Sequence, residues 1–174
     1  DPLRETFRAT GGNSPLTVDL VGTGTSSGTG EVLFRVNAGG PALAETDGTG
    51  VGWSADTKSA PSPYVNAADS GNQAYATGSA ITVDAGVPTS VPANLFQTER
   101  WDPLTPSAEM LWSFPVTDGD YEVRLYFAET YSGAFGTGLR QFDVLIEGAL
   151  ALDNYDQYAD AGGEYIGVVQ NFTV

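Results

Sequence analysis

Alternating apolar and polar positions predict that this chain folds as β-strands. In residues 121–129 every second side chain is large and apolar, namely Tyr121, Val123, Leu125 and Phe127. Residues 141–147 repeat this two-residue period, and no window shows a sustained helical period. Because successive side chains of a strand point to opposite faces, the pattern is that of strands with one buried face.

Short strands of the same kind are expected along most of the chain. Besides these two segments, strands are expected at residues 32–40, 80–84, 94–97, 109–116, 149–153 and 164–174. The dipeptide Asp118-Gly119 predicts a tight hairpin turn between two of them. Residues 41–79 are rich in Gly, Ser, Pro, Asn and Asp and are expected to form loops. Strands in quick succession predict an all-β fold, an antiparallel β-sandwich of the jelly-roll type.

The first 30 residues differ from the rest of the chain. Residues 13–21 alternate apolar and polar side chains, and residues 22–30 consist of Gly, Thr and Ser alone. A lone strand does not fold by itself, so two interpretations are open. In one, residues 1–30 are the strand remnant of a preceding domain plus a linker, because the segment resembles the final strand of an immunoglobulin-like repeat, and the main domain is 31–174. In the other, this strand belongs to the main domain.

Composition agrees with one turn-rich domain. The chain has 174 residues, of which 41% are hydrophobic, with 22 Gly and 10 Pro. Its formal net charge is −15. Such a surface repels phosphate groups, so neither nucleic acid nor an anionic membrane surface is an expected partner. No apolar run is long enough to span a bilayer, and membrane insertion is not expected.

The residue types present restrict the chemistry. The chain has no cysteine and no histidine, which excludes disulfides, thiolate zinc sites and Ser-His-Asp triads. A glycoside hydrolase would need two carboxyl groups flanking the scissile bond. The acids available for that role are Glu99, Glu129 and Asp143. A simpler interpretation pairs these acids with the arginines at strand ends, Arg100, Arg124 or Arg140.

Acidic loops are also candidates for a structural calcium ion, which takes carboxylate and carbonyl oxygens. The best stretch is 153–160, which contains Asp153, Asp156 and Asp160. Its spacing does not match a calcium-loop motif. Apart from this ion, no cofactor is expected.

Four short phrases carry a resemblance to a known family. They are Asn-Ala-Gly-Gly at 37–40, Thr-Glu-Arg-Trp at 98–101, Tyr-Phe-Ala-Glu-Thr-Tyr at 126–131 and Phe-Asp-Val at 142–144. In this order, over residues 32–174, the chain resembles the malectin family, and Trp101 in place of Tyr resembles its bacterial branch. The resemblance implies a carbohydrate-binding jelly roll. It also implies that the last strands are lacking, which would leave an unpaired sheet edge.

The resemblance also implies which residues touch sugar. Matched by position, the family's aromatic contacts fall on Trp101, Tyr131 and Tyr64, and Ser132 stands where the family has Phe. The late acidic contact of the family has no counterpart. For Trp101 and Tyr64, packing against the core is the alternative role. Two further tryptophans are expected to be structural, Trp53 as a loop anchor and Trp112 in the core.

These observations predict a non-catalytic carbohydrate-binding module. The resemblance places it in an exported multidomain bacterial protein, extracellular or on the cell surface, with an oligosaccharide or polysaccharide as partner. Stacking on aromatic rings is modest, so the expected dissociation constants are about 10 µM to 1 mM, or roughly 4 to 7 kcal/mol. Two alternatives remain. One is a structural or adhesive module that exchanges strands with neighbouring domains or chains by β-strand addition, and the other is a glycoside hydrolase.

Overall fold

The computed structural model describes residues 4–10, 17–23, 30–71, 73–102, 109–117 and 119–174. The strands in these ranges are β1 (Arg4–Thr10), β2 (Thr17–Thr23), β3 (Glu31–Ala38), β4 (Ser54–Asp56), β5 (Gln73–Ala76), β6 (Thr82–Val83), β7 (Thr98–Trp101), β8 (Met110–Pro115), β9 (Asp120–Phe127), β10 (Phe142–Ile146), β11 (Ala149–Tyr155) and β12 (Ile166–Thr173). The helical segments are short: α1 (Ala67–Ser70), α2 (Gln157–Ala161) and the 3-10 turns η1 (Ala93–Gln97) and η2 (Ser132–Ala134).

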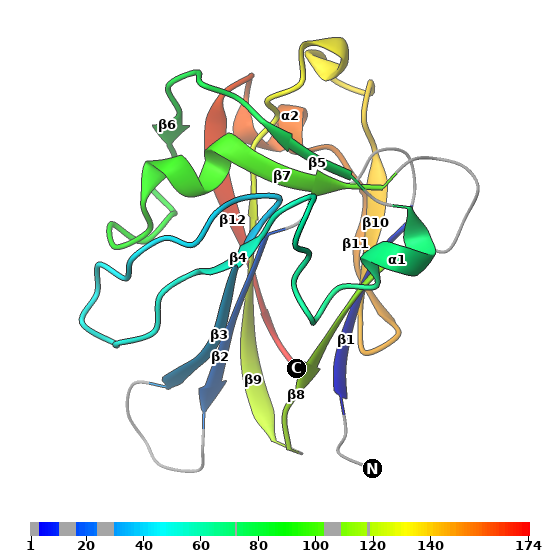
Figure 1. Ribbon diagram of the computed structural model, residues 1–174. Coiled ribbons are helices and arrows are strands. Elements are labelled where there is room, and N and C mark those ends of the chain that lie inside the picture. Colours follow the sequence, from blue (N-terminus) through cyan, green and yellow to red (C-terminus); the bar gives the residue numbers. More distant parts are fainter. Residues whose placement is uncertain (1–3, 11–16, 24–29, 72, 103–108, 118) are drawn as a thin grey trace.

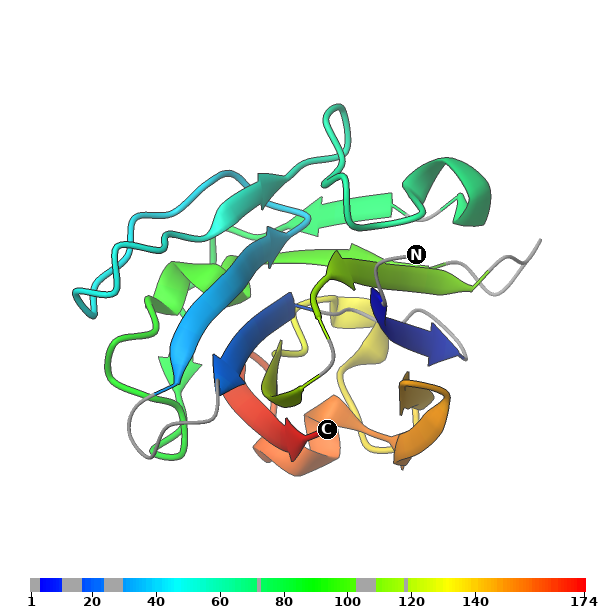
Figure 2. The same ribbon diagram turned by 90° about the horizontal axis from the view of Figure 1, so that it is seen from below.

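The described strands form two main sheets and a separate two-stranded ribbon. One sheet has the order β11-β10-β1-β8 and the other β4-β3-β2-β9-β12-β6, while β5 pairs with β7. Neighbours are antiparallel except for the parallel pairs β3–β4 and β6–β12. Figures 1 and 2 show the two sheets as layers, with the β5–β7 ribbon and α2 at the end away from the N-terminus. The predicted all-β sandwich is confirmed.

Strand predictions from the two-residue period hold for β3, β8, β9, β10, β11 and β12. Residues 94–97 were expected as a strand and form η1 instead, because adjacent Leu95 and Phe96 are both buried on one side. The hairpin at Asp118-Gly119 is also wrong. Strands β8 and β9 lie in different sheets, and their apolar faces meet across the core. Asp118 itself lies outside the described residues.

Strands β1 and β2 each occupy an inner position in a main sheet. Strand β2 pairs antiparallel with both β3 and β9, from Val18 opposite Val36 and Leu125 onward. Strand β1 pairs antiparallel with β8 and β10. Strands β1 and β2 therefore take part in the sandwich, as in the interpretation that gives the strand to the main domain. Residues 13–16 and 24–29 of this segment lie outside the described residues. At the other end of the chain, β12 is paired on both sides, by β9 and by β6.

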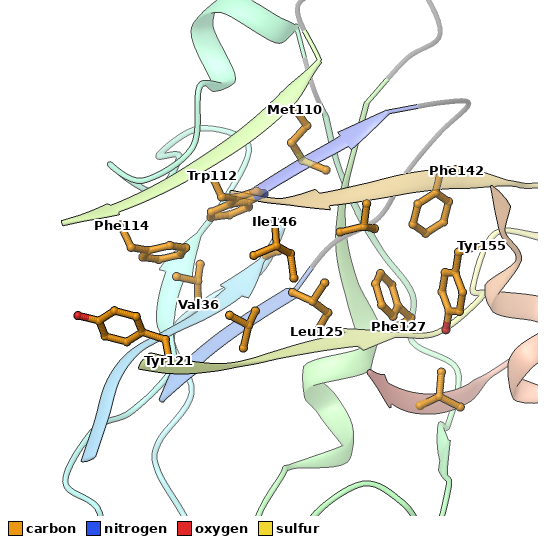
Figure 3. Close-up of a cluster of buried hydrophobic side chains, with 14 of the residues drawn as sticks. Val36, Met110, Trp112, Phe114, Tyr121, Leu125, Phe127, Phe142, Ile146 and Tyr155 are labelled. Carbon is orange, nitrogen blue, oxygen red and sulfur yellow. The ribbon is translucent and has the colours of Figure 1, made fainter. Parts of the chain in front are cut away.

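Large aromatic side chains fill the space between the two sheets (Figure 3). Trp112 and Phe114 of β8 are fully buried and stack at 6.4 Å between ring centroids. Opposite them lie the inward residues of β9, and further members come from β3, β10, β11 and β12. The prediction that Trp112 is a core residue is confirmed. Burying aromatic side chains contributes most of the stabilisation of such a core.

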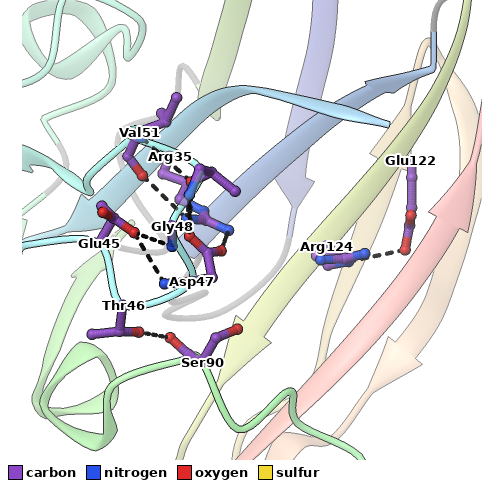
Figure 4. A network of polar contacts seen from close by, with 10 residues as sticks. Arg35, Glu45, Thr46, Asp47, Gly48, Val51, Ser90, Glu122 and Arg124 are labelled. Carbon is purple, nitrogen blue, oxygen red and sulfur yellow. Dashed lines mark hydrogen bonds and ion pairs between the residues drawn. The ribbon is translucent and has the colours of Figure 1, made fainter. Parts of the chain in front are cut away.

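A second apolar cluster lies on the outer face of the six-stranded sheet, under the long loops. Trp53, 2% exposed, meets Tyr126 edge to face at 5.5 Å. Its backbone exchanges two hydrogen bonds with Leu43, which closes the loop between β3 and β4. Arg35 lies over the Trp53 ring. The same arginine binds Asp47 at 2.5 Å, as Figure 4 shows. Trp53 is thus the loop anchor that the sequence predicts.

Candidate functional site

The β5–β7 ribbon presents a row of functional side chains on one face. Its register sets Tyr75 opposite Glu99 and Gln73 opposite Trp101. Because alternate residues of a strand share a face, Glu99 and Trp101 project together from β7, and Tyr75 joins them from β5. These three side chains, with Tyr131 and Arg140, line a pocket of about 180 Å³.

Tyr131 lines the pocket together with the ribbon residues. It follows β9, and its backbone N–H donates to the Glu129 carboxylate at 2.9 Å, which fixes where the ring emerges. The side chains of Tyr131 and Tyr75 are 47% and 37% exposed, and their rings meet edge to face at 6.2 Å. Two half-exposed aromatic rings therefore stand beside a polar floor.

The floor of the pocket is a buried group of charges. Arg140, 5% exposed, lies between two carboxylates, with Nη1 3.6 Å from Glu99 Oε1 and Nε 3.3 Å from Glu129 Oε2. Glu129 also accepts a hydrogen bond from Gln157 Nε2 at 2.9 Å, and Glu99 accepts one from Thr130 Oγ1 at 3.3 Å. The prediction that these acids pair with arginine is confirmed for Glu99 and Glu129.

Burial shifts the pKa of both carboxyl groups, Glu99 and Glu129. It raises the pKa of the Glu99 carboxyl to about 7, although the Arg140 guanidinium opposes the shift and the charge of Glu129 adds to it. Burial likewise raises the pKa of Glu129, and Arg140 again opposes the shift. The floor therefore changes its charge near neutral pH.

The raised pKa of Glu99 predicts a pH-dependent stability. In the unfolded chain Glu99 titrates near 4.5, whereas in the fold its pKa is about 7. The folded state therefore holds a proton that the unfolded state has lost, so stability falls as pH rises between these values, by at most about 3 kcal/mol. We expect urea unfolding of Glu99→Gln to show a flatter decline than the wild type. The control is Glu122→Gln, which changes a partly exposed glutamate outside the pocket and should keep the decline. An unchanged decline in Glu99→Gln would contradict the assignment.

The other face of β7 anchors the ribbon to the sandwich. Arg100 points away from the pocket and binds the Asp56 carboxylate twice, Nε to Oδ2 at 2.5 Å and Nη2 to Oδ1 at 2.7 Å. Asp56 also accepts the backbone N–H groups of Gly39 and Ser62, at 2.9 and 2.7 Å. The family phrases at 37–40 and 98–101 thus meet in one buried network that holds Glu99 and Trp101 in place.

The structure brings together two of the predicted sugar contacts. Trp101 and Tyr131 line the pocket. Tyr64 lies elsewhere and packs on Phe34 and Phe114 at the margin of the core, as its alternative role requires. Ser132 is exposed directly after Tyr131, at the start of η2, and is not among the lining residues.

Three further residues line the pocket, Tyr75, Glu99 and Arg140. The sequence indicated Glu99 and Arg140 only as a candidate acid and a possible arginine partner, not as sugar contacts, and it did not single out Tyr75. Glu99 had a usable signal, since it alternates with Trp101 along the same short strand. Tyr75 had none, because its strand lies in a Gly- and Ser-rich region expected to be loop. Arg140 precedes β10, and its side chain lies beside Glu99 and Glu129 only once the chain has folded. The sequence around it therefore gave no signal.

The candidate calcium stretch uses its acids in local hydrogen bonds. Asp156 caps α2 by accepting the Ala159 N–H at 2.9 Å, and Asp160 accepts from the Tyr155 hydroxyl at 2.7 Å. Within the described ranges, no three His, Cys, Asp or Glu side chains are grouped as a metal ion requires. A calcium ion stays a prediction. None of the helices described here is long and apolar enough to cross a membrane.

Comparison with known proteins establishes the family of this chain. A family model for the malectin domain matches residues 32–174. The chain belongs to the malectin domain family. Malectin domains are carbohydrate-binding, lectin-like modules that bind oligosaccharides and are not catalytic. No curated protein and no solved structure matches the chain. The matched segment includes all five pocket residues and begins after β1 and β2.

Proposed function

We propose that this malectin domain binds an oligosaccharide in the pocket between the β5–β7 ribbon and Tyr131. The observation that carries the proposal is a set of aromatic side chains, Tyr75, Trp101 and Tyr131, around a buried acid–arginine floor. Sugars present CH-rich faces that stack on aromatic rings and hydroxyls that need directional hydrogen bonds. Tyrosine and tryptophan supply the former with few rotatable bonds, and Glu99 with Arg140 supplies the latter.

The arrangement of the acids supports binding without catalysis. A glycosidase places its two carboxyl groups on either side of the scissile bond. Here Glu99 and Glu129 both face the same guanidinium, and Glu129 is fully buried with hydrogen bonds from Tyr131 and Gln157. Only Glu99 of this pair lines the pocket. The pocket therefore lacks the opposed pair in the part of the chain that the structure describes.

The setting of the module is a further part of the proposal. We place it in an exported, multidomain bacterial protein, extracellular or on the cell surface, where an acidic, cysteine-free module with weak sugar affinity gains avidity from repeated copies. A structural module that works by β-strand addition is the second candidate. It is favoured by the insertion of β2, from outside the family segment, between β3 and β9.

Replacing Tyr131 by alanine tests the proposed site. We expect at least about a tenfold loss of oligosaccharide affinity, because the exposed ring supplies one stacking wall. Calorimetric titration against the oligosaccharides that bind the wild type in a glycan array measures the loss. The half-exposed ring also contacts Tyr75 and Arg140, so its removal should cost about 1 kcal/mol of stability. Circular dichroism should therefore show an intact fold.

The control for this variant is Leu150→Ala, another exposed large side chain, which lies on β11 outside the pocket. It should bind like the wild type. Full affinity in a folded Tyr131→Ala variant would show that sugar binds elsewhere. A wild-type chain that is folded and binds no glycan would favour the strand-addition candidate.

A further inference from the structure

The charges on the pocket floor restrict which sugars fit. Glu99 and Glu129 oppose the single guanidinium of Arg140, so the floor carries a formal charge of −1 when both acids are ionised. Among the described residues, Arg140 is the one cation that lines the pocket. Its charge is therefore already more than balanced before a ligand arrives, in a chain whose net charge is −15.

The two acids differ in what they offer a ligand. Glu129 is fully buried and accepts hydrogen bonds from Tyr131 N and Gln157 Nε2. Glu99 lines the pocket and accepts one hydrogen bond, from Thr130 at 3.3 Å, with Arg140 Nη1 3.6 Å away. Nη1 and Nε of Arg140 are buried, and they face Glu99 and Glu129. Glu99 is therefore the acceptor that this pair offers to a ligand, with the arginine charge held behind it.

We infer that this Glu99–Arg140 pair makes the pocket selective for uncharged sugars and excludes uronic acids. A hydroxyl has a proton to donate to the Glu99 carboxylate. A sugar carboxylate only accepts hydrogen bonds, and the negative charges of Glu99 and Glu129 repel it. This inference rests on the proposed function, because it takes the pocket as the place where sugar binds.

The selectivity depends on pH. The titratable or charged groups that face Glu99 are Arg140, Glu129, Tyr131 and, across the ribbon, Tyr75. Burial raises the pKa of Glu99 to about 7, whereas a sugar carboxylate, with a pKa of about 4, is ionised throughout the range from about pH 5.5 to 8.5. Raising the pH therefore adds a charge to the floor and none to the ligand. Repulsion of uronic acids strengthens, and hydroxyls gain an ionised acceptor.

Matched sugar pairs test the inference on the wild-type chain. The probes are trisaccharides of glucose, galactose and mannose, each paired with its counterpart oxidised at C6 to the uronic acid. Titration calorimetry at pH 5.5 and 8.5 gives the affinity ratio of each pair. For the trisaccharide that binds best, we expect at least about a tenfold preference for the neutral form at pH 8.5, which is about 1.4 kcal/mol. The preference should be smaller at pH 5.5.

The variant Glu99→Gln separates the effect of the Glu99 charge from the effect of its side-chain shape on the sugar preference. This variant keeps an acceptor at the same place and should lose the pH dependence of the preference, a result that a purely structural role for Glu99 would not produce. Glu122→Gln removes an equal charge near the start of β9, away from the pocket, and should keep the pH dependence of the preference. Equal or tighter binding of the oxidised sugar by the wild type at pH 8.5 would overturn the inference while leaving sugar binding established. If neither member of any pair binds, the proposed function fails and the inference fails with it.

Discussion

Replacing Asp56 by alanine is expected to destabilise the fold by about 3–5 kcal/mol, the usual loss when one partner of a buried ion pair is removed. Asp56 and Arg100 are 0% and 1% exposed, and two short hydrogen bonds join them. The alanine variant would leave the Arg100 guanidinium buried beside the unpaired N–H groups of Gly39 and Ser62. Each such donor adds its own desolvation cost. Urea unfolding followed by tryptophan fluorescence measures the difference.

A partly exposed ion pair provides the comparison for this variant. Glu122 and Arg124 lie 2.9 Å apart on β9, with side chains that are 36% and 25% exposed. Solvent screens such a pair, so Glu122→Ala should cost no more than about 1 kcal/mol. Similar losses in Asp56→Ala and Glu122→Ala would mean that the buried network does not hold the β5–β7 ribbon.

The sequence predicts the parts of this fold that depend on neighbouring residues, and not the parts that depend on contacts between distant segments of the chain. The two-residue period located β9 and β10 because each strand has one face on the core, and that requirement is local. It could not assign strands to sheets. The Asp118-Gly119 signal shows this limit, since a turn dipeptide reports a change of direction and not the partner of the strands that it joins. Here those strands face each other across the core.

The pocket shows the same limit. Tyr131 and Trp101 could be anticipated from their places at strand ends and from the family phrases. Tyr64 was expected to touch sugar on the same grounds, but Phe34 and Phe114 lie within ring-packing distance and take it into the core margin. Tyr75 replaces it in the pocket because of the β5–β7 register, which is set by pairing across the chain segment 77–97. Such long-range pairing leaves no periodic signal in either strand.

The glycine pair that follows β3 connects the sandwich to the pocket. Gly39 has a φ of +77°, and a Cβ at this position would lie 2.0 Å from the carbonyl oxygen of Glu99 and 3.0 Å from the backbone N of Arg100. The backbone of β7 therefore runs against the bare Cα of Gly39. Because Glu99 belongs to the pocket floor, any side chain at residue 39 displaces the pocket together with the strand.

Gly39→Ala is accordingly expected to lower both stability and sugar affinity. Alanine with positive φ costs about 1–2 kcal/mol, and a backbone clash that shifts β7 should add about 2 kcal/mol or more. Gly48→Ala separates the cost of the positive φ from the cost of the clash, since Gly48 has a φ of +76° and nothing within 4 Å of the added Cβ. That variant should lose the conformational part alone and bind oligosaccharide normally. Urea unfolding and calorimetric titration of both variants measure this. Equal destabilisation of the two, with sugar binding intact in Gly39→Ala, would show that β7 tolerates the displacement and that the pocket does not depend on this contact.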